Sequence, residues 1–396
     1  MVEPFRRFLL LYSATGGGHL GAARAVAEGL QERFGGQARV ELVDALAEYG
    51  PWPISRVPDW YGTMLRSSGR FYGLGFHLFD GHRRARSLSA LFRLWALPAA
   101  HRLLADHPAD AVITFHPVPV HTLAYALSRL QPPIPLVAVG VDLVAMHAFW
   151  VDPGVSCYLV ATESARNRLL RHGLDPRRVR VVGLPVCRRF YEVRKRDPRV
   201  LRRRLGLSPQ MPVVLTMAGG IGFAPLERVV RALVDATLPA QIVVIAGHNR
   251  RLCERLRPLA AEGRLRMEGF VENIHEWMRA ADLLVTKAGP ATLAEALAVG
   301  VPPVIWGAIP VQETPNVRLL VGAGAGVWAP GPRRTAEVVH RLLGDAGARA
   351  RMRRQADRLV RPDAAGRIAE TVWRIAEEGA SRRPGNLQEA GKPSGD

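Results

Sequence analysis

The sequence predicts an α/β protein with two doubly wound, Rossmann-like domains that face each other across a cleft. Three observations lead to this prediction. Short apolar runs alternate with helical patterns, as in successive strand–helix units of a parallel sheet. The alternation occurs in two series, separated by a stretch rich in arginine and proline. The length of 396 residues exceeds one ordinary core and suits two domains.

The first series begins with an apolar run at residues 7–14. Glycines follow, and apolar residues then recur at helical spacing until Gly35 and Gly36 end the pattern. Short, continuous apolar runs are typical of strands that are buried on both faces of a parallel sheet. The remaining strands of this series are expected near residues 38–43, 111–115, 135–141, 156–161 and 179–182.

The second series starts at Pro212 and repeats the same alternation. Its strands are expected near residues 213–217, 241–246, 264–268, 282–286 and 302–306. In doubly wound sheets, ligands bind in the crevice outside the carboxyl ends of the strands. Two such series therefore predict a ligand site between the two domains.

These patterns divide the chain into four segments. Residues 1–184 are expected to form the first domain, 185–211 a linker, and 212–378 the second domain. The last helix of the second domain, at 364–378, could pack back on the first domain. Polar residues, glycine and proline dominate 379–396, which predicts a disordered tail.

The charge balance calls for an anionic partner or surface. The formal net charge is +19 and the isoelectric point is near 11.1, which leaves nucleic acid and anionic lipid open. No uncharged apolar run approaches the roughly 18 residues of a membrane span, and the apolar N-terminal run is too short for a signal peptide. Cys157, Cys187 and Cys253 fit neither a disulfide framework nor a zinc site, so we expect a cytoplasmic protein.

A glycine loop with a histidine at its tip lies between the first strand and the first helix. Gly16, Gly17 and Gly18 allow a sharp turn and the close approach of another molecule, and His19 could act as a general base near neutral pH. The loop lacks the spacing of dinucleotide-binding and P-loop motifs. The alternative interpretation is a strand–helix turn with an incidental histidine.

The most informative stretch follows the strand at 282–286. Lys287 and Gly289 form the turn, and Pro290 stands near the first turn of a helix, where proline is tolerated. The N–H groups of such a helix start can hold a diphosphate, to which Thr292 could add a contact. Glu295, one turn further along, could accept hydrogen bonds from ribose hydroxyls; a solvent-exposed helix carboxylate is the alternative.

Two further loops are expected at the same end of the second sheet. Gln312, Glu313 and Asn316 follow the strand at 302–306, and amide and carboxylate groups suit sugar hydroxyls. Gly219 and Gly220 follow the strand at 213–217 and form a second glycine turn facing the cleft. A helix start is the alternative explanation for the first of these loops.

Together these motifs resemble the monogalactosyldiacylglycerol synthase and processive diacylglycerol glucosyltransferase family. The resemblance covers roughly residues 8–345, and 286–316 is similar to the donor signature of that family. It implies the GT-B fold of inverting glycosyltransferases related to MurG. It also implies transfer of a hexose from a uridine diphosphate (UDP) sugar to diacylglycerol or a related membrane glycolipid.

The resemblance assigns roles to individual residues. It implies that the helix starting at Gly289 faces the diphosphate, that Glu295 holds the ribose, and that Gln312 and Glu313 face the hexose. The segment containing Phe270 and Val271 would border the uracil.

On the acceptor side, the glycine loop with His19 matches one motif of the family, and Asp142, His147 and Trp150 match a second. The family usually has Thr-Asp and His-Pro where this chain has Val141-Asp142 and His147-Ala148, and it often has a glutamate where Gly220-Ile221-Gly222 is neutral. These departures concern the choice of substrate more than the chemistry.

The mechanism expected from these residues is a direct displacement at the anomeric carbon. His19, or Asp142 through or beside it, would remove the proton of the acceptor hydroxyl, and helix N–H groups would stabilise the leaving diphosphate. No Asp-x-Asp sequence occurs, so neither a metal nor another cofactor is expected besides the UDP-sugar substrate. The displacement should invert the anomeric centre.

Residues 51–104 interleave aromatic residues with arginines. Arg83, Arg84, Arg86 and Trp95 are typical of an interfacial helix on an anionic membrane, although the helix could instead pack on its own sheet. We therefore expect peripheral association with the inner face of the cell membrane.

Other functions remain open at this point. A MurG-like transfer of N-acetylglucosamine to a lipid-linked precursor and a UDP-sugar epimerase share the expected fold. A nucleic-acid-binding protein could use the charge, but no nucleic-acid-binding module is visible and we expect no nucleic-acid partner. Glucose, galactose and N-acetylglucosamine cannot be distinguished as the sugar from these residues.

Overall fold

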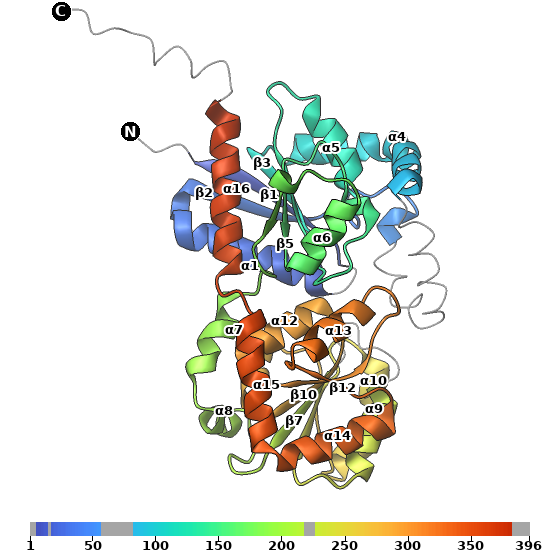
Figure 1. The fold of residues 1–396 in the computed structure, drawn as a ribbon, viewed down its shortest axis with the longest axis vertical. Coiled ribbons are helices and arrows are strands. Elements are labelled where there is room, and N and C mark those ends of the chain that lie inside the picture. The colour runs from blue at the N-terminus through green and yellow to red at the C-terminus, as the bar shows by residue number, and fades with distance from the viewer. Residues whose placement is uncertain (1–4, 15–16, 57–81, 218–225, 382–396) are drawn as a thin grey trace, which may run out of the picture.

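The computed structural model describes residues 5–14, 17–56, 82–217 and 226–381, with the backbone alone from 82 to 91. Two six-stranded sheets, in which every strand pairs in parallel, form two domains stacked along the long axis of the molecule (Figure 1). The α/β class and the two doubly wound domains predicted from the sequence are confirmed.

The sheet of the first domain has the strand order β2-β1-β3-β4-β5-β6. Alternate residues of β1 contribute to two separate core clusters, so both faces of the sheet are covered. Its strands are β1 (Arg6–Tyr12), β2 (Ala38–Asp44), β3 (Ala111–Thr114), β4 (Leu136–Val139), β5 (Cys157–Val160) and β6 (Val179–Val181). Its helices are α1 (Gly17–Phe34), α4 (His82–Asp106), α5 (Val120–Ser128) and α6 (Glu163–Arg171).

The sheet of the second domain has the strand order β12-β11-β10-β7-β8-β9. Its strands are β7 (Val213–Met217), β8 (Gln241–Ile245), β9 (Arg266–Glu268), β10 (Leu283–Lys287), β11 (Pro303–Gly307) and β12 (Val327–Trp328). Its helices are α9 (Leu226–Asp235), α10 (Arg250–Ala261), α11 (Ile274–Ala280), α12 (Pro290–Val299), α13 (Thr314–Gly322), α14 (Pro332–Gly344) and α15 (Ala346–Leu359). Every strand expected from the apolar runs is present, and the two-residue β12 was not expected.

The segment expected to be a linker contains two short helices, α7 (Arg188–Glu192) and α8 (Pro198–Arg204). Phe190 and Leu201 are buried in the same core cluster as residues of β7. Asp197 caps α8 by accepting a hydrogen bond from the Arg199 N–H at 2.7 Å. The segment therefore packs as part of the second domain, and its helices are too short to give a clear sequence period.

The last helix, α16 (Ala364–Ser381), returns to the first domain and lies along α1 (Figure 1). Trp373 stacks on Phe34 with ring centroids 4.0 Å apart, and Arg33 pairs with Glu370 at 2.5 Å. The helix continues through Ser381, into the segment expected to be a tail. The remaining residues of that segment lie outside the described part of the chain.

Candidate functional site

The switch points of the two sheets hold the predicted loops. In the first sheet the winding reverses between β1 and β3, and in the second between β7 and β10. The His19 loop follows β1, and the turn at Gly289 follows β10. Doubly wound folds bind ligands at such points because the loops on either side diverge there.

His19 lies in the first turn of α1 and bridges the first switch point. Its Nδ1 atom is 2.6 Å from the carbonyl oxygen of Phe115, directly beyond β3. A carbonyl can only accept, so Nδ1 carries a proton and Nε2 is the basic nitrogen. Burial lowers the pKa of His19 below its usual value, against the opposing effects of the Phe115 carbonyl and Asp44. The neutral imidazole therefore has Nε2 ready to accept a proton.

Two residues near this loop were not singled out from the sequence. Asp44, at the end of β2, accepts a hydrogen bond from the Ala14 N–H at 2.8 Å and so holds the start of the glycine loop. The His116 ring centroid lies 4.7 Å from that of His19, and burial lowers the pKa of His116 well below its usual value. Asp44 ends β2 and His116 comes two residues after β3, so their position at the carboxyl ends of strands is the signal that could have identified them.

The carboxyl-end loops of the two domains contact each other. A Cβ atom added to Gly18 would lie 3.3 Å from the Cβ of Ala291 in α12, so the glycine permits this approach. Asp142 forms a side-chain hydrogen bond with Gln312 of the second domain. Burial raises the pKa of Asp142 to about 7; the Gln312 hydrogen bond opposes this shift and Glu313 adds to it. The predicted residues of the two domains thus meet at one boundary.

His147 and Trp150 lie in the loop after β4 and are both buried. The His147 Nδ1 accepts a hydrogen bond from the Phe149 N–H at 3.1 Å, so the neutral ring carries its proton on Nε2, from which it can donate. Trp150 is 1% exposed and belongs to the core of the first domain, so its side chain shapes this loop from within. A catalytic role for His147 and an acceptor-side role for Trp150 stay predictions.

The start of α12 is a suitable anion site. Gly289 is the N-cap residue without a side-chain cap, and Pro290 occupies the first turn. The N–H groups that follow have no partner within the helix, and the positive end of the helix dipole favours a diphosphate. Thr292, in the same turn, is half-buried.

Lys287, Glu313 and Asn316 hold the turn that precedes α12. The Lys287 Nζ pairs with a carboxylate oxygen of Glu313, whose other oxygen accepts from the Ile309 N–H at 2.9 Å. The Asn316 side chain donates to the Ala288 carbonyl at 3.0 Å. Glu313 and Asn316 are buried, so Gln312 is the residue of this loop that reaches the domain boundary.

Glu295 lies in the middle of α12 and is half-buried. Burial raises its pKa to about 7, and the nearby Arg189 acts against this shift. Since Arg189 belongs to α7, Glu295 is close to the segment that connects the two domains. A carboxyl group in this setting can change protonation when a polar ligand arrives.

The expected uracil segment contains an exposed aromatic pair. Phe270 is 58% exposed and stacks on His248 with ring centroids 4.5 Å apart and planes inclined by 14°. Val271 is half-buried and packs on the core of the second domain. These residues follow β8 and β9, at the carboxyl end of the second sheet.

Several predicted residues cannot be placed. Gly16, Gly219 and Gly220 lie outside the described residues, whereas Gly17 begins α1. Arg83, Arg84 and Arg86 lie in α4, but their side chains are outside the described part. Trp95, also in α4, is 44% exposed.

Among the described residues, no group of three or more histidine, cysteine, aspartate or glutamate side chains could hold a metal ion, and metal independence stays a prediction. No helix in this part of the chain is long and apolar enough to cross a membrane.

Comparisons with known proteins agree with this geometry. A family model described as monogalactosyldiacylglycerol synthase matches residues 19–186, and one described as the glycosyltransferase family 28 C-terminal domain matches residues 213–330. The chain is 34% identical over 388 residues to the probable monogalactosyldiacylglycerol synthase 2, chloroplastic, of Oryza sativa subsp. japonica. This match covers 95% of the chain and 82% of the relative.

Solved structures show the same fold at low identity. The MurG structure of Acinetobacter baumannii gives a TM-score of 0.61 at 16% identity, covering 93% of this chain and 99% of that one. A UDP-GlcNAc 2-epimerase of Neisseria meningitidis, bound to UDP-GlcNAc, gives a TM-score of 0.60 at 13% identity. The match covers 93% of this chain and 100% of that one. With its family match and its relatives, the chain belongs to the monogalactosyldiacylglycerol synthase family and is a glycosyltransferase with the GT-B fold.

Proposed function

We propose that the protein transfers a hexose, galactose as in the names of its relatives, from a UDP-sugar to the free hydroxyl of diacylglycerol. The contact between Gly18 and Ala291 is the observation that carries this proposal. It brings the His19 loop beside the anion-binding start of α12, so that a base and a leaving-group site lie on opposite sides of one boundary.

The second domain suits the donor. The uracil would stack near the exposed Phe270–His248 pair, and the ribose hydroxyls would donate hydrogen bonds to Glu295. The diphosphate would accept hydrogen bonds from the N–H groups at the start of α12. Gln312 would contact the sugar from its position beside Asp142. Lys287 and Asn316 would act by holding the turn in place.

In the reaction, the acceptor oxygen attacks the anomeric carbon while the bond from that carbon to the diphosphate oxygen breaks. The acceptor proton passes to the Nε2 of His19, whose Nδ1 is held by the Phe115 carbonyl. Asp142, with its pKa near 7, is the second candidate for proton acceptor. The N–H groups at the start of α12 stabilise the charge that develops on UDP, so the proposed step uses no metal.

The acceptor side of the first domain suits a lipid. An apolar cavity lies between α4, α5 and the segment after β2, and none of its lining residues is charged. Val118 and Pro119 line it, two and three residues after His116, whose ring centroid lies 4.7 Å from that of His19. This neighbourhood supports an acceptor site close to the proposed base. Its volume is about 40 Å³, which leaves room for only a short part of a hydrocarbon chain, so we assign to it a contact with part of an acyl chain of the acceptor.

Exposed apolar side chains adjoin the same cavity. Trp52 is 74% exposed, Leu94 71% and Trp95 44%. Trp52 follows Pro51 of the cavity wall, and Leu94 and Trp95 lie between two other wall residues, Phe92 and Ala96. Such side chains can insert into the headgroup region while arginines bind anionic lipid. Peripheral attachment to the inner face of the cell membrane, from the cytoplasm, is part of the proposal.

Product analysis tests the function directly. Vesicles containing diacylglycerol would be incubated with UDP-galactose, UDP-glucose or UDP-N-acetylglucosamine, and lipid products identified by mass spectrometry. We expect a hexosyl-diacylglycerol, formed fastest from UDP-galactose. A product only on a lipid-linked peptidoglycan precursor, or conversion of the UDP-sugar without a lipid product, would contradict the proposal and favour the MurG-like or the epimerase alternative.

A further inference from the structure

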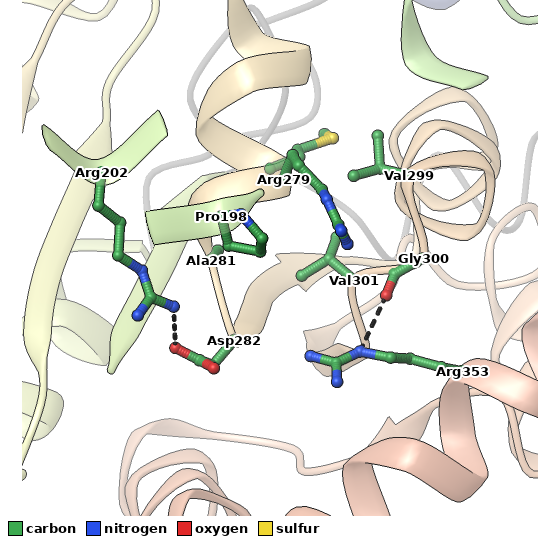
Figure 2. A pocket seen from close by; sticks show the side chains of 10 residues that line it. Pro198, Arg202, Arg279, Ala281, Asp282, Val299, Gly300, Val301 and Arg353 are labelled. Atoms are coloured by element: carbon green, nitrogen blue, oxygen red, sulfur yellow. Dashed lines mark hydrogen bonds and ion pairs between the residues drawn. The ribbon is translucent and has the colours of Figure 1, made fainter. Parts of the chain in front are cut away.

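A separate, polar cavity lies in the second domain. It is at the carboxyl end of α12, whereas the proposed diphosphate site is at the amino end of that helix. It has a volume of about 280 Å³ and is lined by residues of α8, α11, α12 and α15 together with the start of β10 (Figure 2). Asp282, at this cavity, precedes β10, whereas Lys287 ends that strand. The cavity is thus at the amino end of the sheet, and the proposed donor site is at the carboxyl end.

Three arginines from three helices reach this cavity. Figure 2 shows Arg202 beside Asp282, Arg353 beneath Gly300, and Arg279 between them. The hydrogen-bonding groups of Arg202 have partners within the protein. Its guanidinium pairs with Asp282 at 2.6 Å, and its Nε donates to the Ala280 carbonyl at 2.8 Å. Its role is to form the wall.

Arg279 and Arg353 are less completely paired. Each donates through Nε alone, Arg279 to the Arg196 carbonyl at 2.9 Å and Arg353 to the Gly300 carbonyl at 3.2 Å. Neither has a carboxylate within 4.0 Å among the described residues, and their terminal nitrogens have no hydrogen-bond partner there. Capping the carboxyl end of α12 accounts for the Nε of Arg353 but leaves these terminal donors unused.

The electrostatics agree with this geometry. Burial lowers the pKa of Arg279 and Arg353 below the usual arginine value, and the two guanidinium groups also repel each other. Arg194 adds to the repulsion although it pairs with Asp357 at 2.6 Å, and Asp197 and Asp282 partly offset it. Half-buried cations held together without full compensation favour a bound anion.

We propose that this cavity is a binding site for a phosphate group, held by the terminal nitrogens of Arg279 and Arg353. The planar guanidinium group matches phosphate oxygens with paired hydrogen bonds, and two positive charges that are only partly compensated favour a dianionic monoester over a monoanionic diester. Because the two sites lie at opposite ends of α12, phosphate and UDP can bind at the same time.

Calorimetry with inorganic phosphate tests the site. Saturating UDP would first fill the donor site, so that further phosphate binding reports on the cavity. We expect one phosphate per chain, and at least a tenfold loss of affinity in the Arg279→Gln/Arg353→Gln variant. The Arg177→Gln/Arg333→Gln variant removes the same charge from side chains that are 91% and 95% exposed and should bind phosphate as the parent does.

Vesicles distinguish a lipid headgroup from free phosphate. If the occupant is a headgroup, the parent should float with phosphatidic acid vesicles better than the double variant, and phosphatidylglycerol should show a smaller difference. If it is a free phosphate, flotation should be equal and calorimetry alone should separate the proteins. An unchanged affinity for UDP shows that the double variant is folded. If the double variant does not fold, the single variant Arg353→Gln takes its place. The proposal is wrong if neither free phosphate nor phosphatidic acid distinguishes parent from variant, or if the parent binds neither at this site.

Discussion

At the scale of single residues, His19 is held in a defined orientation beside the end of β3. The Phe115 carbonyl fixes its tautomer, and its pKa lies below the usual histidine value because the ring is buried. A base of this kind stays unprotonated at mildly acidic pH. Asp142 and Glu295 show the opposite effect, since burial raises the pKa of each carboxyl group to about 7.

Replacing His19 with alanine should lower turnover on the order of a hundredfold or more, because the acceptor proton loses its base. UDP affinity should hardly change, since His19 belongs to the domain opposite the donor. Steady-state kinetics and calorimetry would measure the two effects separately. His340→Ala, at an exposed position on α14, is the matched control. Near-parental turnover of the His19 variant would remove it as the base.

Glu295 should make UDP affinity depend on pH. Its carboxyl group is protonated below its pKa of about 7 and ionised above it, and the carboxylate accepts hydrogen bonds from ribose more strongly. Affinity should therefore rise from pH 6 to pH 8 more in the parent than in Glu295→Gln. Glu295→Ala should weaken UDP binding by about 1–3 kcal/mol. Identical affinities in parent and alanine variant, measured by calorimetry, would exclude Glu295 from the site.

At the scale of elements, the turn between β10 and α12 is fixed by an ion pair. Glu313 is 3% exposed, and Lys287 supplies its positive partner. Breaking such a pair leaves a buried charge without compensation, whereas removing both charges costs less. The ion pair thereby connects the stability of the second domain to the position of the proposed diphosphate site.

Lys287→Met should lower the free energy of unfolding by about 2 kcal/mol. This is less than the ~3–5 kcal/mol of a fully buried pair, because Glu313 keeps the N–H of Ile309. Adding Glu313→Gln should recover part of the loss. Arg333→Met, which breaks an exposed pair with Glu337, should cost less than about 1 kcal/mol. Denaturant unfolding in which both single variants behave alike would show that the buried pair does not stabilise the turn.

The sequence predicted the strands well because continuous apolar runs mark strands that are covered on both faces. It also located His19 and Gly289, because glycine and proline at strand ends identify turns. It could not show that Asn316 and Glu313 point into the protein, or that Trp150 is buried, because polar and aromatic loop residues look alike whether they face a ligand or the core. The linker helices were missed because each is shorter than two periods of an amphipathic pattern.

At the scale of the whole molecule, the proposed acceptor and donor sites lie in separate domains that meet at one boundary. The first domain carries α4, the apolar cavity and the exposed Trp52, Leu94 and Trp95. The second carries α12, the proposed donor helix. Since α16 crosses back to pack on α1, the chain connects the domains twice, through the segment after β6 and through α16.

Membrane binding should be electrostatic and reversible, and should depend on α4. Each arginine near an anionic surface contributes about 1 kcal/mol, so Arg83→Ser/Arg84→Ser/Arg86→Ser should lower both flotation with phosphatidylglycerol vesicles and turnover on lipid. UDP affinity should not change. Salt should weaken binding by the parent in part, because screening spares inserted aromatic side chains.

The control for that experiment is Arg257→Ser/Arg333→Ser/Arg334→Ser, which removes the same charge from exposed positions on the second domain. If both triple variants float as the parent does, the membrane surface does not include this part of α4, and the basic segment at residues 166–204 becomes the next candidate.

The anomeric configuration of the lipid product tests the central claim most directly. A single displacement between the His19 loop and the start of α12 leaves the attacking hydroxyl on the face opposite UDP. Proton NMR of the hexosyl-diacylglycerol formed from an α-linked UDP-hexose should therefore show a β-linked sugar. An α-linked product would contradict the account, because it would require a second displacement or an attack from the face that UDP leaves.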